Sequence, residues 1–197
     1  MATAGFIYDF VGVSCWNATE NRVISLELRD LKLSGQVPEP LKYCRSLQKL
    51  DIGSNALYGT IPSQICSWLP FLVTLYLSDD ALSGYIPATL GKCTYLNELI
   101  LSNNQFSGAI PYALGNLSRL KSLSVADNHL TGTIPLFFNR FAKEDFTGNS
   151  DLCGGSKCGG LSKKNVAVII AAGVAGAAAA LLLAFGLWFC DKCQKVN

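Results

Sequence analysis

Leucine and isoleucine recur through residues 23–141 in a pattern that repeats roughly every 24 residues. The five copies begin at apolar residues, namely Val23, Leu47, Leu72, Leu96 and Leu120. Each copy reads approximately L-x-x-L-x-L-x-x-N-x-L-x-G-x-I-P-x-x-L. The alternation in its first half has the period of a β-strand with one buried face. One such strand cannot bury its leucines alone, so we expect stacked coils with parallel strands and one shared core.

The second half of the repeat predicts how each coil turns away from its strand. The asparagine side chain can bond to backbone groups at the turn, and neighbouring asparagines then form a ladder. Glycine allows a tight bend, and Ile-Pro gives an extended segment. The ladder position holds Leu31 in the first copy and Asp80 in the third. Leu31 suits an end repeat, whereas Asp80 can accept but not donate, so we expect a weaker ladder there.

The same alternation predicts which side chains face outward from the concave strands. They are Glu27 and Arg29, Asp51 and Gly53, Tyr76 and Ser78, Ile100 and Ser102, and Ser124 and Ala126. Tyr76 beside Ile100 is notable because aromatic anchors concentrate at binding surfaces, although scattered surface apolar residues explain the pair equally well. From this set the candidate partner-binding residues are Glu27, Arg29, Asp51, Tyr76, Ile100 and Ser124.

An uncharged apolar run of 24 residues, 166–189, predicts one membrane-spanning helix. As a helix it measures about 36 Å, enough to cross the hydrocarbon core of a bilayer with some tilt. Lys163 and Lys164 precede the run, and Trp188 and Phe189 lie where interfacial aromatics are favoured. We therefore expect the lipid bilayer to be a partner. A buried core helix is the alternative, which the lack of a polar face disfavours.

Charge and motifs narrow the class of function. The 16 basic and 14 acidic residues are interspersed, with a net charge of +2, so no nucleic-acid partner is expected. The kinase signature motifs, a P-loop and metal-ligand spacings are not found in the sequence. We therefore expect no catalytic residues, no cofactor, no metal and no small-molecule substrate. The sequence predicts a binding protein rather than an enzyme.

Five of the eight cysteines fall into two groups by position. Cys44, Cys66 and Cys93 lie inside the repeats, where we expect them to be small buried hydrophobic residues. Cys190 and Cys193 directly follow the apolar run. S-palmitoylation is the hypothesis for this pair, with inert thiols as the alternative.

Two features of the sequence bear on which side of the membrane the repeats occupy. Asn17-Ala18-Thr19 and Asn116-Leu117-Ser118 are glycosylation sequons, which agree with extracellular or lumenal repeats. The first ten residues lack a basic start and an adequate apolar run, so we expect no signal peptide in this sequence. A tail-anchored orientation with cytosolic repeats therefore remains open beside the extracellular one.

The L-x-G-x-I-P half of the repeat resembles the plant-specific leucine-rich-repeat class, which builds a right-handed superhelix with a concave parallel sheet. Three segments are more specific: RVISLELRD at 22–30, ICSWLP at 65–70 and CGGLSKKN at 158–165. They look like the BIR family of plant leucine-rich-repeat receptor-like pseudokinases. The resemblance implies a plasma-membrane protein whose extracellular repeats bind SERK-type co-receptor kinases and restrain receptor-kinase signalling.

The ends of the repeat array also resemble known caps. Residues 145–153, followed by Cys158, are similar to the C-terminal cap of plant receptor ectodomains, and this similarity implies a Cys153–Cys158 disulfide. Two free thiols are the alternative. Residues 11–16 resemble the end of the N-terminal cap, but Tyr8 stands where the second cysteine of that cap is expected, so Cys15 lacks its usual partner.

The sequence therefore predicts an α/β repeat solenoid of the plant leucine-rich-repeat type, with one transmembrane helix. The parts are a cap remnant at 1–22, five repeats at 23–144, a C-terminal cap and linker at 145–165, the span at 166–189 and a tail at 190–197. Two alternatives to a membrane-anchored regulator stay open. One is a truncated gene product without independent function, and the other is a module like the polygalacturonase inhibitors.

Overall fold

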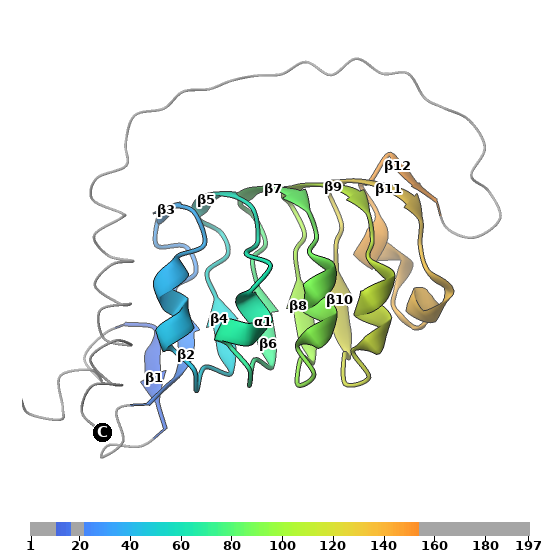
Figure 1. Ribbon diagram of the computed structural model, residues 1–197. Helices are drawn as coiled ribbons and strands as arrows, with labels where there is room; N and C mark the ends of the chain where they lie inside the picture. Colours follow the sequence, from blue (N-terminus) through green and yellow to red (C-terminus); the bar gives the residue numbers. More distant parts are fainter. Residues whose placement is uncertain (1–10, 17–21, 154–197) are drawn as a thin grey trace, which may run out of the picture.

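The computed structural model describes residues 11–16 and 22–153, whose strands form two six-stranded sheets. Figure 1 shows the coils stacked side by side, from β1 and β2 at one end to β12 at the other. Each coil runs through a strand of the first sheet, a strand of the second sheet and then a short helix. The predicted repeat solenoid is therefore confirmed.

The first sheet contains the strands that the L-x-L alternation predicts. In spatial order they are β1 (Val13–Cys15), β2 (Val23–Glu27), β4 (Lys49–Asp51), β6 (Thr74–Tyr76), β8 (Glu98–Ile100) and β10 (Ser122–Ser124). Neighbours from β2 to β10 pair in parallel with the inward leucines in register, as Leu50 opposite Leu75 shows. Only β1 runs antiparallel, with Val13 opposite Leu26. This strand covers the open edge that the first coil would otherwise expose.

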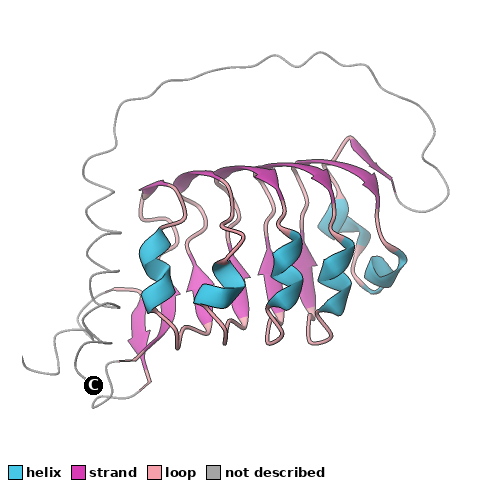
Figure 2. Cartoon of the chain, viewed as in Figure 1, coloured by secondary structure: helices cyan, strands magenta, loops and turns pink. Residues whose placement is uncertain are grey.

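The second sheet follows the turn after each ladder position and runs along the upper edge of the molecule (Figure 2). In spatial order it contains β12 (Asp151–Cys153), β11 (His129–Thr133), β9 (Gln105–Ala109), β7 (Ala81–Tyr85), β5 (Ala56–Gly59) and β3 (Ser34–Gly35). Its strand pairs are parallel as well. Glycines with positive φ, such as Gly84 (φ 78°) and Gly108 (φ 74°), let the chain bend here.

A row of short helices lies beside the strands of the first sheet (Figures 1 and 2). They are η2 (Glu39–Tyr43), α1 (Ile65–Trp68), η3 (Ala88–Lys92), η4 (Tyr112–Asn116), η5 (Leu136–Arg140) and η6 (Lys143–Phe146). Pro87 and Pro111 immediately precede η3 and η4 in extended conformations, as the Ile-Pro motif predicts. The helices and the first sheet enclose the interior between them.

The interior is a single column of apolar side chains, most of them leucine and isoleucine. The inward leucines of successive strands, Leu50, Leu75, Leu99 and Leu123, are buried in one cluster. Each buried leucine contributes about 1.5–3 kcal/mol, and its neighbours belong to the coils on either side. Stability therefore comes from stacking rather than from any single coil.

The asparagine ladder forms where the repeat predicts it. Asn104 Nδ2 donates hydrogen bonds to the carbonyl oxygens of Leu77 (2.6 Å), Leu101 (3.3 Å) and Ser102 (3.1 Å). Its Oδ1 accepts one from Leu82 N–H at 3.0 Å, so the amide joins two coils. The same pattern of three donated bonds and at least one accepted bond occurs at Asn55, Asn128 and Asn149.

The prediction that the repeat cysteines are simple buried hydrophobic residues is wrong. Cys66 in α1 and Cys93 after η3 form a disulfide, with their Cα atoms 5.0 Å apart. Cys44, Cys66 and Cys93 are all buried, as expected. Cys44, like the other two, does not carry a free thiol. The Cys66–Cys93 bond links two consecutive coils across 27 residues of sequence. Its presence indicates an oxidising compartment.

None of the helices in the described ranges is long and apolar enough to cross a membrane. The predicted span, 166–189, lies outside the described residues.

We predict that Asn104→Ala destabilises the domain by on the order of 3 kcal/mol, because the buried Leu77 carbonyl and the buried Leu82 N–H lose their partner. Urea unfolding followed by circular dichroism measures the change. Gln105→Ala, at the exposed next residue, is the matched control. Equal midpoints for the two variants would contradict a structural role for the ladder.

We predict that Cys66→Ala/Cys93→Ala lowers the free energy of unfolding by about 3 kcal/mol, because the crosslink restricts the unfolded chain. Non-reducing peptide mapping gives an independent check. It should recover the peptides containing Cys66 and Cys93 as one linked species. Recovery of both cysteines as alkylated thiols without reduction would refute the bond.

Candidate functional site

The polar side chains of the concave sheet bind one another across the strands. Lys49 Nζ lies 2.6 Å from Glu27 Oε2, and this hydrogen bond holds the pKa of Glu27 below its ordinary range. Arg29 Nη2 lies 2.7 Å from Asp79 Oδ2, and Arg29 Nη1 donates to Ser78 Oγ at 3.2 Å. These exposed charges are thus matched within the sheet rather than left unpaired.

Arg29 reaches from the first coil to the third across Gly53. A Cβ atom on Gly53 would lie 3.1 Å from Arg29 Nη1 and 2.7 Å from the Ser78 carbonyl oxygen. Arg29 Nη1 also lies 3.9 Å from Asp51 Oδ1. Asp51 was expected to be exposed to solvent, and this is wrong: it is only 8% exposed, and the Gly53 N–H donates a hydrogen bond to its Oδ1.

The Tyr76 and Ile100 pair is less exposed than the alternation predicts. The two residues lie opposite each other in register, and both are half-buried. The Tyr76 hydroxyl donates a hydrogen bond to Glu98 Oε2. This carboxylate acceptor, together with burial, raises the pKa of Tyr76 to about 12. Ser124 is half-buried beside Ile100 on the next strand.

Three large side chains stack in a column that the strand alternation does not predict. Phe71, Tyr95 and Arg119, here called the edge cluster, lie in the loops leading into β6, β8 and β10. The Phe71 and Tyr95 ring centroids are 5.9 Å apart, and Arg119 Cζ lies 5.0 Å from the Tyr95 centroid. Phe71 is 52% exposed and Tyr95 is 41% exposed. These loops follow the lower edge in Figure 1, opposite the second sheet.

A signal for the edge cluster is present in the sequence. Each of the three residues immediately precedes the first buried leucine of its copy, so they share one repeat position at intervals of 24. Stacked coils bring such positions next to one another. A scan of loop positions for aromatic and arginine residues would have found the column.

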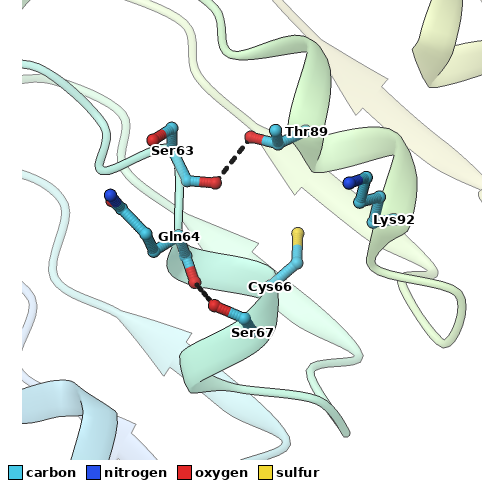
Figure 3. Close-up of a pocket in the computed structure, with 6 residues that line it drawn as sticks. All are labelled: Ser63, Gln64, Cys66, Ser67, Thr89 and Lys92. Atoms are coloured by element: carbon cyan, nitrogen blue, oxygen red, sulfur yellow. Dashed lines mark hydrogen bonds between the residues drawn. The ribbon is translucent and has the colours of Figure 1, made fainter.

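A shallow cavity of about 350 Å³ lies between the second and third coils, beside the disulfide (Figure 3). It is lined by Ser63, Gln64, Cys66, Ser67, Thr89 and Lys92. Thr89 Oγ1 donates to the Ser63 carbonyl oxygen, and Ser67 Oγ donates to that of Gln64, both at 2.7 Å. The Cys66 sulfur is bonded to Cys93, so this lining offers neither a thiol nucleophile nor a carboxylate or histidine base.

In the part of the chain that the structure describes, no group of three or more histidine, cysteine, aspartate or glutamate residues could hold a metal ion.

Of the predicted modification sites, Asn116 is exposed at the end of η4. Cys153 is half-buried in β12. The other predicted positions lie outside the described residues, namely Asn17, Cys158, Cys190 and Cys193.

Comparison with known proteins agrees with this architecture. The Leucine Rich Repeat family model matches residues 46–68, 95–117 and 119–141. The crystal structure of the BIR2 ectodomain from Arabidopsis thaliana aligns with 80% of this chain and 83% of its own, at 54% identity and a TM-score of 0.76.

The chain belongs to the BIR family.

Two further matches extend this assignment. The Arabidopsis thaliana protein named inactive LRR receptor-like serine/threonine-protein kinase BIR2 is 62% identical over 192 residues, which are 95% of this chain and 32% of that protein. This BIR-family chain therefore spans about a third of the length of that curated relative. A chain of the BIR3–SERK2 complex from Arabidopsis thaliana is 57% identical, with a TM-score of 0.74, covering 75% of this chain and 79% of its own.

We predict that Gly53→Ala destabilises this BIR-family domain by about 1–3 kcal/mol, because its Cβ would displace Arg29 and press on the Ser78 carbonyl. Thermal unfolding is the measurement. Ser102→Ala is the control, since Ser102 holds the same repeat position two coils later and already carries a side chain. A Gly53→Ala variant as stable as the control would refute the close crossing of Arg29.

Proposed function

We propose that this BIR-family chain is a membrane-anchored regulatory module whose repeats bind the ectodomain of a SERK-type co-receptor kinase. The edge cluster is the observation that carries the proposal. Aromatic and arginine side chains are enriched at the energetic centres of protein interfaces. Phe71 and Tyr95 are both exposed here, and Arg119 stacks on Tyr95.

The contrast with the concave sheet favours the edge cluster as the anchor. On the sheet face, Glu27, Arg29 and Tyr76 already have partners on other coils. A binding partner would have to replace those contacts before gaining new ones. The rings of Phe71 and Tyr95 offer apolar area that no neighbouring strand covers. The concave residues then serve as a polar border to the interface.

Similarity to known complexes supports the kind of partner. A chain in the BIR3–SERK2 complex matches this one at 57% identity, which supports a SERK-type protein as the partner. The predicted span at 166–189 would anchor the repeats to the bilayer. The 12 residues at 154–165 can reach at most about 40 Å, so the repeats would stay close to the membrane and meet partners there.

We predict that Tyr95→Ala and Arg119→Ala each weaken binding of the SERK2 ectodomain by about 10-fold or more, as expected for interface anchors. Biolayer interferometry with the full chain in nanodiscs measures the dissociation constant. Tyr58→Ala is the matched control, because Tyr58 is 51% exposed but lies in β5 of the second sheet, at the opposite edge.

Two outcomes would overturn parts of this proposal. Ile100→Ala tests the concave face, and a loss confined to that variant would move the anchor from the edge cluster to the sheet. If the wild-type chain shows no SERK2 binding at micromolar concentrations, the proposed partner is wrong.

A further inference from the structure

The ladder changes its chemistry at Asp80, the rung between Asn55 and Asn104. Asp80 Oδ1 accepts hydrogen bonds from Asn55 N–H at 3.2 Å and from Leu57 N–H at 2.8 Å. Asn104 Oδ1 accepts from Leu82 N–H in the same way one coil later. The accepting half of the rung is therefore intact at Asp80.

The donating half of this rung is occupied by an oxygen atom. At the asparagine rungs, Nδ2 donates to two carbonyls of its own coil and one of the preceding coil. By equivalence with Asn104, we expect the carbonyls of Leu77, Ser78 and Ile52 to lie closest to Asp80 Oδ2. Asp80 Oδ2 is buried, and no hydrogen-bond partner for it exists among the described residues. An ionised carboxylate would direct lone pairs at these carbonyls, whereas a carboxylic acid has an O–H to donate.

The charged groups near Asp80 do not stabilise its ionised form enough to offset burial. Burial raises the pKa of Asp80 to about 7, outweighing the N–H groups of Leu57 and Asn55, which lower it. The adjacent Asp79 carboxylate raises the pKa further, and Arg29 opposes it. Arg29 is paired with Asp79 at 2.7 Å, so the effects of these two opposite charges on Asp80 largely cancel.

We propose that Asp80 is held protonated in the folded domain and donates a hydrogen bond in the ladder, so that stacking of the second and third coils weakens when it ionises. The folded chain then keeps a proton that the unfolded chain releases between about pH 4 and about pH 7. The stabilisation from this rung is complete below about pH 4 and falls as the pH rises to about 7. The contact between the second and third coils is therefore sensitive to pH.

Asp80→Asn tests this inference, because the amide supplies the missing donor at every pH. Thermal unfolding of the full chain in detergent micelles is compared at pH 5 and pH 8 by circular dichroism. We expect the midpoint of the wild type to fall by about 5 °C more than that of Asp80→Asn over this interval. At pH 8 the variant should be the more stable protein.

Asp127→Asn is the matched control, since it makes the same chemical change at an exposed turn residue beside the Asn128 rung. It should follow the wild type at both pH values. Carboxyl ¹³C NMR supplies a second readout, in which one aspartate signal titrates near pH 7 and is lost in Asp80→Asn. Parallel midpoints for wild type and Asp80→Asn, or titration of Asp80 near pH 4, would overturn the proposal.

Discussion

Each coil of this domain depends on leucines that no single coil can bury. The strands of the first sheet from β4 onward are three residues long, and each directs one central leucine inward. Leu75 is fully buried in the cluster that it shares with Leu50 and Leu99, its partners on the strands to either side. The free energy of folding is therefore shared between neighbours, and the two ends need covers. Antiparallel β1 covers the first coil, and η6 with the buried Phe146 covers the last.

Stacking also turns backbone carbonyls toward the interior, where each needs a hydrogen-bond donor. The asparagine amides supply these donors, and one amide serves two coils at once, as Asn104 does between Leu77 and Leu101. An unpaired buried carbonyl costs about 1–3 kcal/mol, so the chemistry of a single rung influences the whole stack. Asp80 departs from this chemistry, and it does so between the two coils that the Cys66–Cys93 disulfide also joins.

The concave sheet and the edge loops differ in how far their side chains are already paired within the domain. On the concave sheet, long charged side chains reach across strands spaced less than 5 Å apart and neutralise one another. The contacts of the edge cluster run along the column, from Phe71 to Tyr95 and from Tyr95 to Arg119. Phe71 and Tyr95 therefore keep exposed ring area, and Arg119 stacks on Tyr95 from the next coil. The same 24-residue period that aligns the core leucines thus aligns Phe71, Tyr95 and Arg119 at the edge.

Local pattern alone determined the period of the coils, the inward leucines, the Ile-Pro bends and the ladder positions. These features repeat within about 24 residues, so one copy predicts the next, as at Leu75 and Leu99. Only the tertiary structure decided the rest. Cys66 and Cys93 occupy different repeat positions and meet because one coil stacks on the next. Asp51 was expected to be exposed on the concave face yet is buried, with Arg29 of the preceding coil 3.9 Å from its carboxylate. Alternation tells which face a side chain takes, but what covers that face depends on long side chains from neighbouring coils.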